Sequence, residues 1–409
     1  MKEKNKSMKT ADRMVQKGMA KAIKLLKMKQ GIKIEGEGSI CRIGQILSYE
    51  NRQKPFLVTG SHVSKTDFFL RIKNELKDCV VFDGVHPDPD VKLIEQMVTC
   101  YQEKGCDCLV AIGGGSSIDA MKACAARIMC PGKSLSQMKG LLKVRKKLPL
   151  MIAIPTTAGT GSECTIATVV CERNHKYAIN DPCLCPDYAI LDPCLSVSMT
   201  QTMSAYSGMD ALTHAIEAYL NKPYHQKDTK EHCLCAIQLI FQNLLKAYRN
   251  PDDLKARANM LEASYQAGLA FTVACVGNVH ALAHTFGGLY HVPHGKANAI
   301  LLPYILEEYG QSIQKDLAEI AEALGMEEKD ERCRAQLLIQ RIRYMNQAMQ
   351  IPAKLEVNKK DIAQMAKWAC QEANPLYPVP VIFDQKDFEQ ILQKVANIQS
   401  TNLAMNYQA

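Results

Sequence analysis

The chain has 409 residues, more than one typical compact domain, and 47% of them are apolar, so two substantial cores can form. Lys and Arg number 50 against 42 acidic residues, a formal net charge of +8. Residues 1–30 carry this whole excess, because ten basic side chains stand there against Glu3 and Asp12. Since the rest of the chain is electrically balanced, the composition argues against a basic nucleic-acid-binding surface across the body of the protein.

Cysteine usage and hydropathy argue against a disulfide-bonded secreted protein and a membrane protein. The 17 cysteines are odd in number and have no disulfide-type spacing, so we expect free thiols, buried or otherwise inert, in a reducing compartment. The Cys-x-Cys pairs lack the spacing of zinc knuckles. No stretch approaches 18 consecutive apolar residues, so no membrane span is expected. These features favour a cytoplasmic protein.

Residues 1–30 predict a basic amphipathic helix. Lysines separate apolar residues that recur near helical spacing, which are Met14, Val15, Met19, Ile23 and Leu26. Three interpretations are open: a mitochondrial presequence, a surface-binding helix, or a helix docked on its own protein. We favour docking on the first domain or on a neighbouring subunit, since presequences are rich in Arg and Ser and this segment has one of each.

Residues 31–195 predict an α/β domain. Short apolar runs indicate strands at 55–59, 78–82, 108–112 and 148–154, and helical periodicity covers 91–104. Because these runs lack polar alternation, we expect a parallel sheet with helices on both faces.

Residues 196–409 predict an all-helical domain. Few strand signals follow residue 195, and long helical stretches take their place. The helices are expected at 207–220, 228–248, 252–269, 298–306 and 311–324.

Two glycine-rich runs follow predicted strands. Gly113 to Asp119 opens a predicted helix, where free backbone N–H groups favour an anion such as phosphate, although a purely structural turn would look the same. The run lacks the G-x-G-x-x-G pattern. A second run, Pro155 to Glu163, follows the strand at 148–154. Together they fit one extended phosphate-bearing ligand at the carboxyl edge of the sheet.

Histidines are concentrated in one window of the helical half, at His280, His284, His291 and His294. His280 and His284 stand four residues apart, on one face of a helix.

The same spacing separates Asp210 from His214 in an otherwise apolar helix. Such groups are costly to bury unless something pairs with them, and a divalent metal would do so. Histidines bonded to the backbone are the alternative. Oxygen and nitrogen ligands suit iron(II), zinc or manganese. Glu163 and Glu217 are read as structural.

In this order the motifs resemble the iron-containing (group III) alcohol dehydrogenases, over residues 34–395. The segments that carry the resemblance are Gly113–Ser116, Pro155–Glu163, Asp192–Pro193, Gly208–Glu217, His280–His284 and Pro293–Gly295. The resemblance implies a dehydroquinate synthase-like architecture. An α/β dinucleotide-binding domain (31–195) would precede an all-helical metal-binding and catalytic domain (196–409).

The resemblance also implies residue roles. Asp210, His214, His280 and His294 would bind the metal, Fe²⁺ first, with Zn²⁺ or another divalent ion as alternatives. His284 would lie near the nicotinamide and relay a proton or orient substrate, and His291 has no implied role. The pyrophosphate would lie on Gly113, Gly114, Gly115 and Ser116, with Asp119 bracing that turn. The nicotinamide side would be lined by Thr156, Thr157, Thr160 and Ser162, with Lys176 near the ribose.

One departure from the family concerns the cofactor. Many NAD-dependent members carry aspartate after the strand at 55–59, and this chain has Gly60 and Ser61 there, with His62 and Lys65 nearby. Losing a negative charge and gaining donors should admit a 2′-phosphate, so we expect NADP(H) over NAD(H).

The resemblance implies an NAD(P)-dependent alcohol dehydrogenase or aldehyde reductase for a small alcohol, diol or aldehyde, working as a homodimer or larger homo-oligomer. The alternatives are a hydroxyacid-oxoacid transhydrogenase, a glycerol dehydrogenase-like enzyme and, more remotely, a metal- or nucleotide-binding protein without catalysis.

Overall fold

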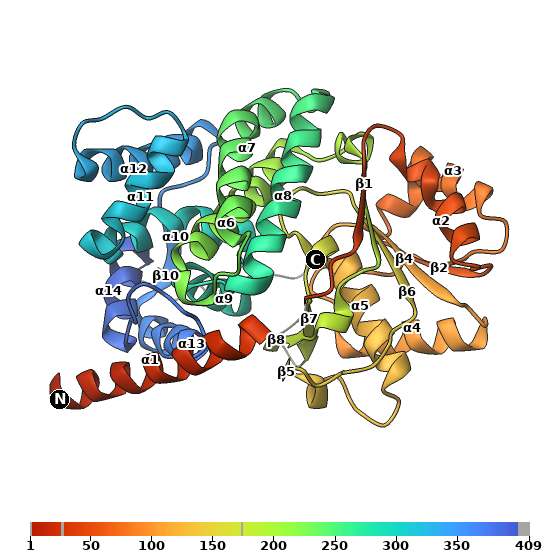
Figure 1. Cartoon of the computed structure of the whole chain (residues 1–409), viewed down its shortest axis with the longest axis horizontal. Coiled ribbons are helices and arrows are strands. Elements are labelled where there is room, and N and C mark those ends of the chain that lie inside the picture. The colour runs from red at the N-terminus through yellow and green to blue at the C-terminus, as the bar shows by residue number, and fades with distance from the viewer. Residues whose placement is uncertain (1, 26–27, 173–174, 400–409) are drawn as a thin grey trace. The chain divides into compact units, whose positions relative to one another are not determined.

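The computed structural model describes residues 2–25, 28–172 and 175–399. The chain folds into two compact units (Figure 1). Residues 24–215 and 226–273 make the α/β unit, and residues 1–23, 216–225 and 274–409 make the helical unit. Parts of the predicted terminal segments, at 1, 26–27 and 400–409, lie outside the described residues.

The α/β unit is built on a six-stranded sheet. Its strands are β1 (Ile32–Glu35), β2 (Pro55–Val58), β3 (Val80–Phe82), β4 (Cys108–Gly113), β6 (Leu150–Pro155) and β9 (Tyr188–Leu191). They run parallel in the order β1-β9-β6-β4-β2-β3. The four predicted strands correspond to β2, β3, β4 and β6. Sequence reasoning missed β1 and β9.

Helices cover both faces of this sheet, as the unbroken apolar runs predicted. Leu57 and Val110 belong to a core shared with α2 (Ile43–Tyr49) and α3 (Asp67–Glu75). The alternate residues Phe56 and Leu109 face the other way, onto α4 (Val91–Glu103) and α5 (Gly115–Met129). The predicted doubly covered parallel sheet is therefore confirmed.

A small second sheet in the α/β unit escaped sequence reasoning. It consists of β5 (Gly140–Leu141), β8 (His175–Asn180) and β7 (Ala167–Glu172), and β7 and β8 are antiparallel. Two long helices, α7 (Thr229–Arg249) and α8 (Leu254–Ala274), lie mostly or wholly within this unit. Helix α6 (Gln201–Leu220) begins in it and ends in the helical unit. The predicted domain boundary at residue 195 stays a prediction.

The helical unit consists mainly of helices. They are α1 (Lys2–Leu25), α9 (Asn278–Tyr290), α10 (His294–Tyr309), α11 (Gln314–Ala323), α12 (Glu331–Ala348), α13 (Ile362–Ala373) and α14 (Gln385–Val395). The expectation of an all-helical half was wrong in one detail. Strands β10 (Leu355–Asn358) and β11 (Ala396–Gln399) pair in parallel. Neither strand has the unbroken apolar run that marks β2 and β4.

The basic helix α1 docks on its own chain and belongs largely to the helical unit (Figure 1). The Arg13 guanidinium donates to the carbonyl oxygens of Val379 and Pro380, each at 2.6 Å. Gln16, which is buried, donates through Nε2 to the carbonyl of Tyr377 at 2.7 Å. These contacts lie within the helical unit, which corrects our expectation of docking on the first domain. The reason is that the segment 377–380 offers carbonyl oxygens outside any helix.

Replacing Arg13 should loosen this contact. We expect Arg13→Ala to lower the free energy of unfolding by about 2 kcal/mol, since its hydrogen bonds are charge-assisted. Lys17→Ala, on the exposed side of the same helix, should leave it nearly unchanged. The measurement is the urea midpoint of unfolding for the two variants and the wild type. Equal midpoints for all three proteins would show that the docking of α1 contributes nothing to stability.

The remaining composition-based expectations concern thiols and membranes. None of the seventeen cysteines forms a disulfide bond, as predicted. Among the described residues no single helix has the length and hydropathy of a membrane span. Helices α8 and α9 together have that length and hydropathy, but they form a bent pair.

Candidate active site

The predicted glycine-rich runs meet at the carboxyl edge of the parallel sheet. The neighbours β2, β4 and β6 end there together. Thr59 donates its hydroxyl to the carbonyl of Ile112 at 2.6 Å, and the Thr156 N–H donates to the carbonyl of Gly113 at 3.0 Å. Gly60 and Ser61 therefore follow β2 at the same edge from which the other two loops start.

The first run holds the second at close range. Helix α5 begins at Gly115, after Gly114 as its N-cap. A Cβ at Gly115 would lie 2.8 Å from the side chain of Thr160, and one at Gly114 would lie 3.3 Å from that of Thr157. Glycine is needed here because the two runs are packed side by side. The start of α5 leaves backbone N–H groups available to an anion.

Asp119 and Lys122 brace these loops from within α5. Ser162 donates its hydroxyl to the carboxylate of Asp119 at 2.6 Å, and the N–H of Val169 donates to the second oxygen at 3.2 Å. The fully buried Lys122 ammonium donates to the carbonyls of Thr165 at 2.8 Å and Ala167 at 2.9 Å. Burial lowers the pKa of Lys122. Asp119 thus holds the second run in place. Sequence reasoning missed Lys122, although it lies three residues after Asp119 on the same helix.

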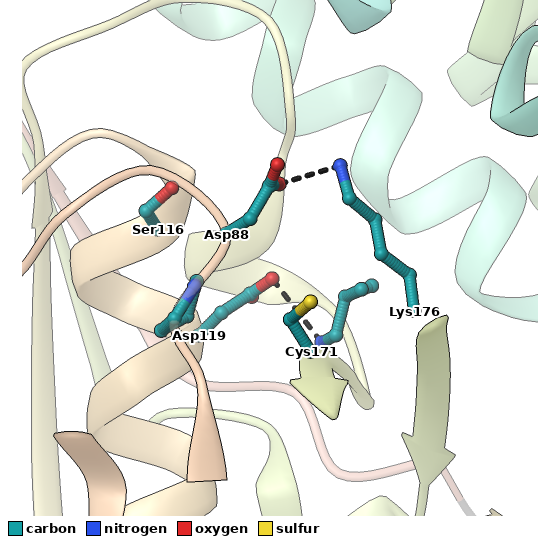
Figure 2. A pocket seen from close by; sticks show the side chains of 7 residues that line it. Asp88, Ser116, Asp119, Cys171 and Lys176 are labelled. Atoms are coloured by element: carbon teal, nitrogen blue, oxygen red, sulfur yellow. Dashed lines mark hydrogen bonds and ion pairs between the residues drawn. The ribbon is translucent and has the colours of Figure 1, made fainter. Parts of the chain in front are cut away.

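A small pocket opens beside the start of α5 (Figure 2). Lys176, from β8, extends toward Asp88, and its ammonium lies 2.6 Å from that carboxylate. The lining residues are Asp88, Pro89, Ser116, Asp119, Val169, Cys171 and Lys176. Three residues assigned to the cofactor by the resemblance, Ser116, Asp119 and Lys176, therefore line one pocket.

Helix α6 presents the first pair of predicted metal ligands. Asp210 and His214 lie four residues apart, and both are buried within an apolar helix. The imidazole of His214 stacks on the ring of Phe271, with the centroids 4.1 Å apart and the planes 17° from parallel. This packing fixes the ring, since a stacked imidazole cannot rotate without displacing its neighbour.

Helices α9 and α10 present the second pair. His280 comes from the first turn of α9, and His294 is the first residue of α10. Asn298, one turn further along α10, places its amide nitrogen 3.1 Å from Nε2 of both rings. Because an amide NH₂ only donates, both Nε2 atoms present lone pairs. The two imidazoles thus have the protonation that metal ligation requires.

Glu217, on the last turns of α6, sets the orientation of His280. Its buried carboxylate accepts from Nδ1 of His280 at 2.6 Å and from the N–H groups of Gly277 and Val279, each at 2.7 Å. It therefore caps the start of α9 and leaves Nε2 of His280 as the lone-pair nitrogen, an arrangement typical of metal-binding histidines. The sequence reading of Glu217 as structural is too narrow, since it also orients a predicted ligand.

The predicted ligand set converges. The side chains whose ligand atoms all lie within 4.8 Å of one another are Asp210, His214, His280 and His294. Three imidazole nitrogens and one carboxylate oxygen suit a divalent transition metal. His284 and Glu163 are not in this group, and burial raises the pKa of Glu163 to about 7. His291 is exposed at the end of α9.

Comparison with known families shows to which family the chain belongs. A family model described as iron-containing alcohol dehydrogenase matches residues 32–193. A second, described as the C-terminal part of the Fe-containing alcohol dehydrogenase family, matches residues 204–396. The chain belongs to the iron-containing alcohol dehydrogenase family. The fold class predicted from the sequence, a dehydroquinate synthase-like pairing of an α/β part with a helical part, is confirmed.

Relatives of this iron-containing alcohol dehydrogenase include enzymes named for both cofactors. It is 32% identical over 355 residues to the NAD-dependent methanol dehydrogenase of Bacillus methanolicus, covering 83% of this chain and 93% of the relative. It is 32% identical over 330 residues to the NADPH-dependent butanol dehydrogenase of Clostridium saccharobutylicum, covering 78% and 83%. A crystal structure of 1,3-propanediol oxidoreductase matches with a TM-score of 0.85 at 30% identity, covering 90% of this chain and all of that one.

Two further polar residues of this alcohol dehydrogenase family member were missed by sequence reasoning. Asn298 is aligned with His294 at i, i+4, a signal that the sequence contains. Glu372, which accepts from Nδ1 of His284 at 2.6 Å, lies 88 residues from its partner, so no local pattern reveals it.

Proposed function

We propose that this protein transfers hydride between a nicotinamide cofactor and a small primary alcohol, diol or aldehyde. The observation that carries the proposal is the convergence of four ligand atoms from Asp210, His214, His280 and His294. The glycine-rich edge of the α/β unit and the names of the relatives support it.

The proposed metal ligands are these four residues, with Fe²⁺ as the favoured ion and Zn²⁺ or another divalent ion as alternatives. The Nε2 lone pairs of His280 and His294 and the carboxylate behind His280 support this assignment. A bound divalent cation would supply Lewis acidity that favours the alkoxide form of a substrate oxygen.

The cofactor is proposed to lie along the carboxyl edge of the sheet. Gly113, Gly114, Gly115 and Ser116 would bind its pyrophosphate at the start of α5. The nicotinamide side would be lined by Thr156, Thr157, Thr160 and Ser162. Lys176 would lie near the ribose, and the fact that it lines one pocket together with Ser116 supports this. Asp119 would position Ser162, because its carboxylate accepts a hydrogen bond from the Ser162 hydroxyl.

His284 is proposed to take up or return the proton of the alcohol oxygen. Its side chain is 37% exposed, and its ring stacks beside His294 with the centroids 5.1 Å apart. It is thus next to the proposed metal ligands and accessible to a substrate.

We propose NADP(H) as the preferred cofactor. The position of the family's aspartate is Gly60 here, and a Cβ at Gly60 would already lie 3.0 Å from the carbonyl of Val85, which disfavours a larger side chain. We expect kcat/KM to be about 10-fold higher with NADPH than with NADH, the equivalent of one charge-assisted hydrogen bond. Lys65→Ala should reduce the value for NADPH alone, and Lys73→Ala on α3 should change neither. A clear advantage for NADH would contradict the preference.

The activity is tested by assaying short aldehydes, alcohols and diols under anaerobic conditions after restoring iron or zinc. We expect metal-dependent oxidation of NADPH with an aldehyde. Oxidation of a hydroxy acid that needs a carbonyl acceptor and releases no free reduced cofactor would instead indicate a transhydrogenase. Activity with no member of the panel would favour a binding protein without catalysis.

Its setting is proposed to be the cytoplasm, and the lack of disulfide bonds among the seventeen cysteines supports this. The proposed assembly is a homodimer or a larger homo-oligomer, and sedimentation velocity tests it.

A further inference from the structure

A carboxylate holds the imidazole of His284. Oε1 of Glu372, from the end of α13, lies 2.6 Å from Nδ1 of His284. The two side chains are 37% and 32% exposed. Glu372 belongs to none of the roles assigned above, so its contact with the proposed proton-transfer residue needs an explanation.

Tyr377 contacts the same carboxylate oxygen. Its hydroxyl donates to Oε1 of Glu372 at 2.9 Å. Burial raises the pKa of Tyr377 well above its usual value, so the phenol keeps its proton and remains the donor. A carboxylate has no hydrogen to donate, so Glu372 accepts a hydrogen bond from His284 just as it does from Tyr377. Nδ1 of His284 must therefore carry a hydrogen, and in the neutral ring Nε2 is the nitrogen with the lone pair.

The backbone around Tyr377 is itself held. Its N–H donates to the carbonyl of Ala373 at 2.9 Å, which continues from the end of α13. Its carbonyl accepts from Gln16 of the basic helix α1 at 2.7 Å. Glu372 is thus part of a fixed contact between two helices, and a fixed partner orients the group that it bonds.

We propose that Glu372 is a positioning residue for His284. Its carboxylate, held by Tyr377, keeps the imidazole in one tautomer and one orientation, with Nε2 available to the substrate proton. This inference rests on the role given to His284 in the proposed function. Because His284 stacks on His294 within 18° of parallel, rotation of the ring would also disturb its packing beside a proposed metal ligand.

The kinetic test compares Glu372→Ala, Glu372→Gln and Gln371→Ala in the metal-loaded protein. Gln371 is exposed on the same helix and serves as the matched control. We expect Glu372→Ala to lower kcat about 10- to 100-fold while KM for the alcohol changes little, since proton transfer is affected and binding is not. Glu372→Gln should recover most of the rate, because its amide oxygen still accepts from Nδ1. Gln371→Ala should match the wild type.

A double-mutant cycle shows whether Glu372 acts through His284. In a His284→Ala background, adding Glu372→Ala should cause no further loss of kcat. A second, independent loss of kcat would overturn the proposal. So would a kcat of Glu372→Ala equal to that of an active wild type.

A spectroscopic test separates this inference from the proposed activity. In zinc-loaded protein with ¹⁵N-labelled histidine, long-range ¹H–¹⁵N spectra report the tautomer of each ring, and His284→Ala identifies the signal. We expect a protonated Nδ1 in the wild type and loss of that preference in Glu372→Ala. Unchanged spectra would overturn the positioning role. An inactive wild type with the expected spectra would instead contradict the proposed function.

Discussion

His280→Ala should lose its bound metal and its catalytic activity together. His280 is one of the four side chains with converging ligand atoms, and its ring is held by Glu217 at 2.6 Å. A Lewis acid supplies several kcal/mol of charge stabilisation and 1.36 kcal/mol is a factor of ten, so we expect activity to fall about 1000-fold or more. Elemental analysis after dialysis and an anaerobic aldehyde reductase assay measure the two effects.

Two histidines of the same window provide the controls for this experiment. His284→Ala should keep its metal and lose rate only, because His284 lies outside the converging group. His291→Asn should keep both, since His291 is exposed and asparagine tolerates its left-handed backbone conformation at φ 53°. Full metal content and turnover in His280→Ala would show that the ligand assignment is wrong.

Glu217→Ala should destabilise the helical unit and weaken metal binding. The substitution leaves three buried groups without their acceptor, namely Nδ1 of His280 and the N–H groups of Gly277 and Val279. A buried partner removed in this way costs about 3–5 kcal/mol. Loss of the carboxylate behind a ligating histidine lowers metal affinity about 10- to 100-fold.

Chemical denaturation and chelator competition measure these two quantities. Glu217→Gln should fall between the wild type and Glu217→Ala, because its amide keeps one acceptor oxygen. Glu307→Gln, whose exposed carboxylate pairs with Arg343, should change both quantities very little. A Glu217→Ala protein with wild-type metal affinity would contradict the role given to this carboxylate.

The sheet and its loops could be predicted because buried parallel strands leave continuous apolar runs. Strands β2, β4 and β6 have this pattern, and glycine follows or ends the first two. Strand β1 has the sequence Ile-Lys-Ile-Glu and is partly exposed, so no such run marks it. Strand β7 likewise mixes buried, partly buried and exposed positions. Strands that carry exposed or partly exposed positions among their apolar residues were therefore not recognised.

The site could be predicted where its residues share a helix. Asp210 with His214, and His280 with His284, reveal themselves through the i, i+4 spacing. Glu372 contacts His284 across 88 residues, and Tyr377 reaches it from outside α13. Such contacts arise when separate helices pack together. They leave no periodic pattern of residues in the local sequence. The docking of α1 is a further example. The acceptors that bind Arg13 and Gln16 are backbone carbonyls, which no particular residue type reveals.

The central claim is that three histidines and one aspartate hold the metal. A crystal structure of the zinc-loaded protein, with data collected on both sides of the zinc absorption edge, tests it most directly. We predict one strong anomalous peak about 2.0–2.2 Å from an oxygen of Asp210 and from a ring nitrogen of His214, His280 and His294. A metal bound by cysteine thiolates, or no peak at these residues in an enzyme shown to need zinc, would contradict the account.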